Sequence, residues 1–282
     1  MGHQVTTLKN NTINQKAEIN VMRRSDINWT ALSSSNHANL AISRNRNYSF
    51  AREQIVIELF NFELQQAVAS IPVAFIKDNN TIKLCGILGL ERGKSLFVND
   101  SGGWQIPFVP AAISSFPFRL GKVSDGRQAV LFAADDENLV GPEEGNLLFN
   151  EGKPSKVLNE HLKLLANMHS SSQRLAKSMD ILEEMGLFQP FEINIPSENN
   201  QYQKVGGLLG INLQAFNNLE DQEFIRLREM NVIELIYAHF YSLSCIQRLL
   251  VTMGFRRKME GGLKDLGSKI FDSDEKDIDF KF

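Results

Sequence analysis

The sequence has little cysteine, no long apolar run and no excess of charge of either sign. Its 282 residues include only two cysteines, Cys85 and Cys245, which excludes a disulfide framework and a cysteine-rich zinc site. No stretch approaches the roughly 18 apolar residues of a membrane-spanning helix. Lys and Arg number 30 against 33 Asp and Glu, so the net charge gives no reason to expect nucleic-acid binding.

Signals for export, phosphate binding and nucleophilic catalysis are also missing. Residues 1–66 contain no uninterrupted apolar segment of a secretory signal, so we expect a cytoplasmic protein. The glycine-rich run at residues 206–210 lacks the spacing of a dinucleotide-binding loop, and the sequence has no phosphate-binding loop of the GxxxxGK[ST] type. A GxSxG nucleophile motif is absent as well.

The five histidines show no metal-ligand pattern. A non-haem iron site needs two histidines and a carboxylate on one face, but the His37-Ala38-Asn39 run has an amide where the carboxylate would stand. His161 and His169 lie eight residues apart without a suitable ligand between them. We therefore expect no iron, zinc or flavin cofactor.

Composition divides the chain into three parts. Residues 1–35 are polar and rich in asparagine, which is typical of an extended, partly disordered arm. Within the first fifty residues, only Trp29 and the run at 37–42 offer apolar groups that can dock on a core. Residues 36–256 are expected to form a single domain, and residues 257–282 a charged tail.

The period of the apolar residues predicts an α+β fold. Between about 71 and 134, short apolar or alternating runs are separated by turn sequences such as Asp78-Asn79-Asn80, which favours an antiparallel β-rich core. From Ser155 the period becomes helical, and it predicts packing helices at about 155–186 and 232–253. Ser155 is a plausible N-cap and Gly186 a stop signal.

Smaller features complete the predicted outline. The serine run at 170–172 is a point where the first long helix can break. Residues 189–203 are expected to be a polar loop, 205–213 a strand with glycines, and 220–230 an amphipathic helix.

The segment from Trp104 to Phe118 interleaves aromatic residues with prolines. Such a segment forms a rigid, apolar and partly unpaired surface, which suits an extended peptide or a protein partner. The candidate contact residues are Trp104, Phe108, Pro110, Phe116, Pro117 and Phe118. The alternative, which the sequence leaves open, is that these aromatic side chains turn inward and close the core.

His239 lies in an apolar helical run at 236–243. A buried histidine has to be hydrogen-bonded, so the run predicts a structural tie between the last helix and the rest of the fold. The alternative role for His239 is that of a catalytic acid or base.

Several of these stretches, taken in order, resemble the motifs of the SapC-like bacterial family. Residues 37–40 are similar to its H-x-N-L motif, which adds His37 and Asn39 to the candidate binding residues. Residues 89–104 resemble its G-L…N-L-F-V…G-x-W segment, with Ser95 in place of the usual Asn. Three further stretches resemble family segments: residues 108–118, 148–152 and 236–243.

The resemblance implies a function that the residues alone do not. Members of this family are described beside flavin-dependent halogenase-like proteins and cupin-like oxygenases, in bacteria rich in TonB-dependent receptors. That setting implies a non-catalytic accessory protein, which holds a peptide or protein partner for a neighbouring modifying enzyme. Such a partner is the halogenase-like enzyme itself or a receptor peptide. The alternatives are a peptide-modifying enzyme that uses His37 or His239, and a structural protein associated with a surface layer.

Overall fold

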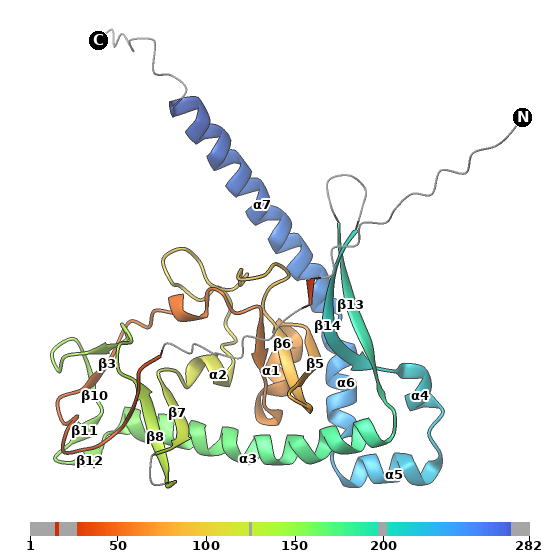
Figure 1. Ribbon diagram of the computed structural model, residues 1–282, viewed down its shortest axis with the longest axis horizontal. Coiled ribbons are helices and arrows are strands. Elements are labelled where there is room, and N and C mark those ends of the chain that lie inside the picture. Colours follow the sequence, from red (N-terminus) through yellow and green to blue (C-terminus); the bar gives the residue numbers. More distant parts are fainter. Residues whose placement is uncertain (1–14, 17–26, 124–125, 197–201, 272–282) are drawn as a thin grey trace, which may run out of the picture.

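The computed structural model describes residues 15–16, 27–123, 126–196 and 202–271, the side chains of 15–16 and 260–271 excepted. Its helices and strands form an α+β fold with antiparallel sheets and C-terminal helices, as the apolar periods predict (Figure 1). The prediction of a polar arm concerns residues that lie mostly outside the described part of the chain.

The largest sheet is built around the predicted hairpin. Its strand order is β1-β14-β5-β6-β4, with β13 on the other side of β14. The strands are β1 (Gln15–Lys16), β4 (Val56–Glu58), β5 (Val73–Asp78), β6 (Thr81–Ile87), β13 (Phe188–Pro196) and β14 (Tyr202–Ile211). All these pairs are antiparallel except β1 with β14, which is parallel.

The turn between β5 and β6 confirms the sequence signal at residues 78–80. Asn79 and Asn80 have positive φ angles of 45° and 67°, the conformation that a two-residue hairpin turn requires and that asparagine tolerates better than most residues. The register therefore runs without a break from Asp78 paired with Thr81 to Val73 paired with Gly86.

Smaller sheets lie toward the other end of the molecule (Figure 1). One has the order β2-β8-β7, another β10-β3-β9, and a third joins β11 to β12. The strands are β2 (Trp29–Ala31), β3 (Ala41–Ser43), β7 (Phe118–Lys122), β8 (Gln128–Ala133), β9 (Leu139–Val140), β10 (Gly145–Leu147), β11 (Phe149–Asn150) and β12 (Lys153–Pro154). Trp29 docks as expected, because β2 pairs with β8 and its ring meets that of Phe116 edge-on.

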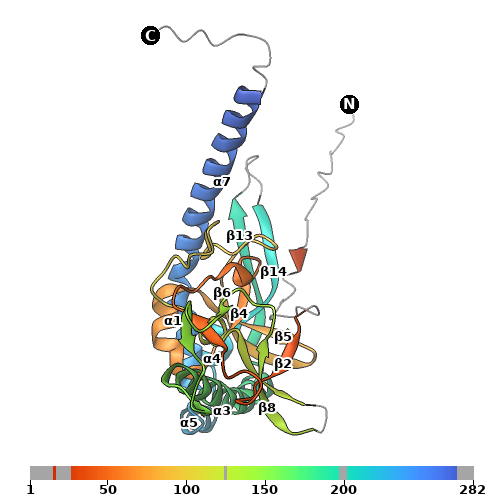
Figure 2. The ribbon, with the colours of Figure 1, turned by 90° about the vertical axis from the view of Figure 1, so that its left-hand side faces the viewer.

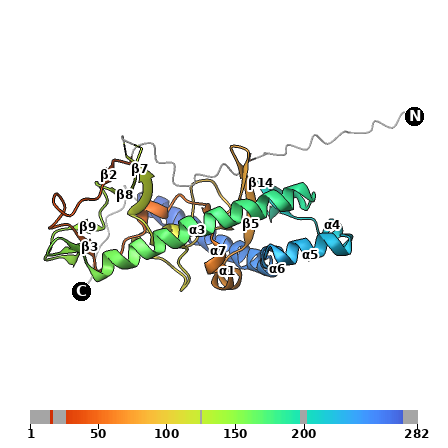
Figure 3. The same ribbon diagram turned by 90° about the horizontal axis from the view of Figure 1, so that it is seen from below.

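The helix α3 (Lys156–Glu184) runs beneath both groups of sheets, as Figure 3 shows. The Ser155 side chain caps its first turn by accepting from the Leu158 amide, and Gly186 ends the segment with a φ of 64°. The serine run does not break it, because the Ser171 hydroxyl is buried and donates to Asn61 Oδ1 at 2.5 Å.

The remaining helices are short, apart from the last. They are η1 (Ser49–Ala51), η2 (Asn61–Glu63), α1 (Leu64–Ser70), α2 (Ala111–Ser114), α4 (Leu213–Asn217), α5 (Asp221–Glu229), α6 (Ile233–Ser242) and α7 (Ser244–Phe271). The helix α6 contacts β5 and β14, while α1 packs against both α6 and α7. None of the described helices is long and apolar enough to cross a membrane.

Three predictions about the second half of the chain are corrected. Residues 188–196 form the strand β13 and not a polar loop, because Ile193 and Ile195 are buried in alternation with exposed polar residues. The predicted helix at 232–253 is two helices, α6 and α7, which meet at Leu243. Finally, α7 continues to Phe271 and so includes the first part of the predicted tail.

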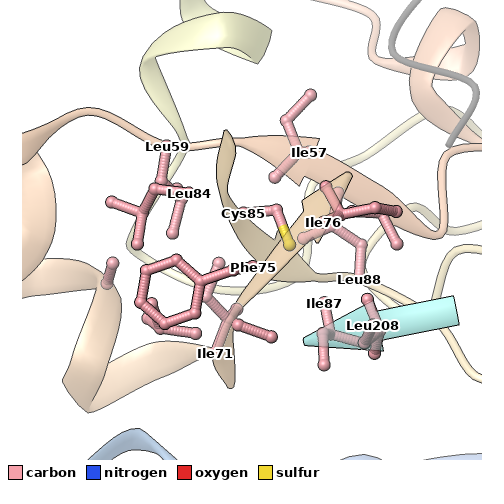
Figure 4. Packing of buried hydrophobic residues seen from close by; sticks show 14 of the residues in the cluster. Ile57, Leu59, Ile71, Phe75, Ile76, Leu84, Cys85, Ile87, Leu88 and Leu208 are labelled. Carbon is pink, nitrogen blue, oxygen red and sulfur yellow. The ribbon is translucent and has the colours of Figure 1, made fainter. Parts of the chain in front are cut away.

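Among the residues that the structure describes, the core consists of two hydrophobic clusters. The larger is centred on β5 and β6, where Phe75, Leu84 and Ile87 are almost fully buried (Figure 4). The smaller includes Phe118 and Phe132 of the β7–β8 hairpin. Because α3 contributes buried residues to both clusters, the two form one continuous packed unit.

His161 of α3 generates a prediction about pH. Its Nδ1 atom is buried without a hydrogen-bond partner among the described residues, and its ring packs on Phe118. Burial, with a smaller contribution from the Arg46 charge, lowers the pKa of His161 from 6.5 to about 4. The unfolded chain therefore binds this proton more readily than the folded one, so the free energy of unfolding should fall by ~3 kcal/mol as the pH drops from about 6.5 to 4.

Urea unfolding at several pH values measures this contribution. His161→Gln should remove that part of the acid-dependent loss, whereas His169→Gln, at an exposed position on the same helix, should keep it. Equal pH dependence in the two variants would contradict the assignment.

Candidate functional site

The aromatic segment predicted to be a binding surface lies mostly inside the core. Phe108, Phe116 and Phe118 are 6%, 4% and 1% exposed, and Pro110 and Pro117 are buried as well. The segment forms a loop and the short helix α2 before β7 begins at Phe118. The inward alternative that the sequence left open therefore describes these five side chains, of which Phe116 also lines a pocket beside Ala133 and Asp136.

Trp104 is the member of the set that stays partly exposed. Its indole N–H donates to the Phe108 carbonyl oxygen at 2.8 Å, and its ring lies 6.0 Å from that of Phe97 and 5.8 Å from that of Tyr48. Trp104 thus packs against the large hydrophobic cluster while part of its side chain stays exposed.

A buried carboxylate fixes the start of α2. Glu63 is 7% exposed, and its two oxygens accept from the amides of Phe60 at 3.0 Å and Ala111 at 2.6 Å. Burial outweighs these hydrogen bonds and raises the pKa of Glu63 to about 7. Because both oxygens are engaged by the backbone, this carboxylate acts as a structural clamp.

The burial of Phe108 generates a stability prediction. Phe108→Ala should lower the free energy of unfolding by about 3–5 kcal/mol, because it leaves a cavity in a packed core. Urea denaturation measures this, with Gln105→Ala, at an exposed position of the same loop, as the matched control. A decrease in the free energy of unfolding of less than ~1 kcal/mol would be typical of a surface position and would contradict the burial of Phe108.

His37 and His239 lie in different parts of the fold. The His37 ring packs on Phe132 in β8 at 4.8 Å, and its Nδ1 atom accepts from the Ser33 amide at 3.0 Å. His239 lies in α6 and contacts β5, and α6 lies well away from β8 (Figure 1). Asn39 is exposed. The structure therefore brings the two histidines into no common site.

His239 has the structural role that the sequence predicted. It is 3% exposed, and its Nδ1 atom lies 2.8 Å from the Val73 carbonyl oxygen, to which it donates. The neighbouring Ser242 hydroxyl accepts from the Val73 amide at 2.8 Å. Burial lowers the pKa of His239, against the opposing effect of the Val73 bond. The two side chains thus bind both backbone groups of one residue of β5 and fix α6 on the sheet.

His239→Ala should therefore destabilise the fold. It leaves the Val73 carbonyl without its partner, and an unsatisfied buried group costs about 1–3 kcal/mol. Thermal and urea unfolding check this, and Tyr241→Ala on the same helix, where the side chain is 68% exposed, is the control. An unchanged free energy of unfolding in His239→Ala would show that the hydrogen bond from His239 to Val73 does not stabilise the packing of α6 on the sheet.

A pocket lined by arginines is the better candidate for a ligand site. It has a volume of about 180 Å³ and lies between α7 and the loop at residues 90–100. Its polar lining includes four cations and two carboxylates: Arg52, Lys94, Arg256, Arg257, Glu91 and Asp100. Its apolar lining comes from Leu90, Leu96, Val98 and Met253.

Two of the arginines hold the pocket together. The Arg256 guanidinium donates to the carbonyl oxygens of Ser95 at 2.8 Å, Leu96 at 3.0 Å and Val98 at 3.2 Å. Arg257 pairs with the Glu91 carboxylate, its Nε lying 2.7 Å from Oε1. These bonds join α7 to the loop and fix the shape of the opening.

The charges of the pocket are not balanced. Arg257 and Lys94 both pair with Glu91. Arg52 donates to the Asp100 carbonyl oxygen at 2.8 Å, and among the side chains that the structure describes neither Arg52 nor Arg256 has a carboxylate partner within 4 Å. A pocket with surplus guanidinium charge and an apolar floor favours an anionic group attached to an apolar body.

Part of this pocket coincides with a motif visible in the sequence. Leu90, Ser95, Leu96 and Val98 belong to the segment at 89–104 that resembles a family motif. Gly89 at its start is required sterically, because a Cβ atom there would lie 2.2 Å from the Lys94 carbonyl oxygen. The sequence motifs do not include the cationic residues of the pocket.

In the part of the chain that the structure describes, no group of three or more His, Cys, Asp or Glu side chains could hold a metal ion. Asp136, Asp135 and Glu53 line a separate pocket of about 500 Å³, together with Phe116. Asp136 Oδ1 accepts there from the Asn138 amide at 3.0 Å.

The sequence matches the SapC family over residues 32–249. Because the match covers most of the chain, this protein belongs to the SapC family. No curated protein and no solved structure matches it.

Proposed function

We propose that this protein is a non-catalytic binding protein that holds a peptide or protein partner by an acidic group placed in the arginine-lined pocket. The observation that carries the proposal is the surplus of cationic side chains around an open, partly apolar pocket. In this proposal the protein presents its partner to a neighbouring modifying enzyme of the bacterial cytoplasm, of the flavin-dependent halogenase-like or cupin-like kind.

The chemistry of the pocket defines the partner further. Guanidinium groups match carboxylates and phosphates by paired hydrogen bonds. Leu90, Leu96 and Met253 offer an apolar contact beside them. A segment with an Asp or Glu next to a large apolar residue meets both requirements, and a phosphorylated side chain meets the first.

The volume supports a side chain rather than a whole cofactor. About 180 Å³ is below the roughly 300–1,000 Å³ of drug-sized ligand sites. The pocket is therefore suited to anchor one group of a larger partner, while the remaining contacts lie on the surface around it.

Arg52→Gln tests the proposal. Arg52 is exposed, and its guanidinium donates only to exposed groups of Ser49, Asn99 and Asp100, so its loss should leave the melting temperature nearly unchanged. A fluorescein-labelled library of short acidic-apolar peptides is screened by anisotropy against the wild-type protein. For the binders, Arg52→Gln should weaken affinity by about tenfold or more, because a charge-assisted hydrogen bond contributes ~1.5–3 kcal/mol.

The controls separate charge from position. Arg228→Gln removes the same charge from an exposed site on α5 and should bind like the wild type. Replacing Asp and Glu in the peptides by Asn and Gln should abolish binding. Phosphopeptides tested in the same assay show whether the pocket prefers a phosphate or a carboxylate. Binding that Arg52→Gln leaves unchanged would contradict the proposal, and a changed peptide mass after incubation would favour the enzyme alternative.

A further inference from the structure

The strand β14 changes partners halfway along its length. Near its C-terminal end it pairs with β5, where Leu209 lies opposite Phe75. Further back it pairs with β1, where Val205 and Gly206 lie opposite Gln15 and Lys16. One edge of a single strand is thus covered by two segments that are far apart in the chain.

A β-bulge causes this change. On the other side of β14, Leu208 pairs with Phe191 and Val205 with Ile193, so Gly206 and Gly207 together oppose one residue of β13. Gly207 has a φ of 90°, a conformation that strongly favours glycine. Bulges bend a strand and end its pairing. The part of β14 before the bulge therefore leaves β5, and it pairs with β1 instead.

The hairpin of β13 and β14 offers one good edge for another strand. The outer edge is formed by β13, which contains Pro190 and Pro196, and proline has no N–H to donate. The inner edge at 205–206 has no proline. A Cβ atom at Gly206 would meet nothing within 4 Å, so packing within the described chain does not explain this glycine.

We infer that the edge of β14 at residues 205–206 is a β-addition site for an extended, polar peptide, and that the chain's own strand β1 fills this site in exchange with such a peptide. The strand β1 shows the geometry of the ligand, since it adds in parallel to the edge. Peptide recognition by strand addition relies on main-chain hydrogen bonds and tolerates many sequences.

Magnitudes explain why β1 can be displaced. Ordering the backbone of one residue costs at least as much free energy as one hydrogen bond returns. Two residue pairs therefore give little net stabilisation. The strand β1 competes for the edge at an effective concentration in the millimolar range, because it belongs to the same chain. A separate peptide can displace β1 if it pairs with β14 over more residues and so binds more tightly.

This inference does not rest on the arginine-lined pocket, and the experiment keeps the two apart. The probe is a fluorescein-labelled peptide with the sequence of residues 11–20. It is titrated into the full-length wild-type protein and into the full-length variant Gln15→Pro/Lys16→Pro, whose own arm cannot pair. A control peptide carries the same two prolines.

The labelled peptide should bind the proline variant at least roughly tenfold more tightly than the wild type, because the competing arm is removed. The control peptide should bind neither protein. Amide hydrogen exchange at residues 205–206 should be faster in the variant and slow again when the peptide is added. Adding Arg52→Gln to the variant should change none of these results, so failure of the pocket proposal leaves this test unaffected.

Three results would overturn the inference. Exchange at residues 205–206 that is the same in both proteins would show that β1 does not protect this edge. Equal binding of the proline control peptide would show that main-chain pairing is not involved. A concentration-dependent dimer in the wild type that is lost in the proline variant would show that the arm of a second copy occupies the edge.

Discussion

The two hydrophobic clusters depend on one continuous helix, α3. Its first turns bury Leu158 and Leu165 in the smaller cluster, and its later turns bury Leu175 and Leu182 in the larger one. A break in the middle would leave two small cores, and small cores retain little net stability. The hydrogen bonds between Ser171 and Asn61 lie at this midpoint, so the serine that looked like a breaking point in the sequence joins the helix to η2.

Much of the fold follows from local signals. The Asn79-Asn80 turn, the Ser155 cap and the Gly186 stop each specify a backbone conformation directly, and the structure has all three. Two of the three errors in the second half of the chain arose where such signals were weak or misleading. Pro190 and the asparagines near residue 200 suggested a loop, although proline is also compatible with the edge strand that β13 forms. The boundary at Leu243 has neither Gly nor Pro to mark it.

The candidate site was harder to predict because it depends on distant contacts. Composition showed that residues 104–118 are aromatic and stiff, but the direction in which the rings point is decided by Glu63 and the surrounding core. Arg52 and Arg256 belong to no local pattern, and they become neighbours only when α7 packs beside the loop at 90–100. His239 was predictable, since a histidine in an otherwise apolar helix needs a buried acceptor.

The last helix stands out from the body of the protein (Figures 1 and 2). Its 28 residues correspond to a length of about 42 Å at 1.5 Å per residue. Arg256 lies near the middle of this helix and donates to the carbonyl groups of Ser95, Leu96 and Val98 in the pocket loop. The loop cannot shift without breaking those bonds or tilting the helix, and a small rotation at Arg256 becomes a large displacement at the helix tip. Any change in the orientation of α7 therefore changes the shape of the pocket, and a change in the shape of the pocket reorients α7.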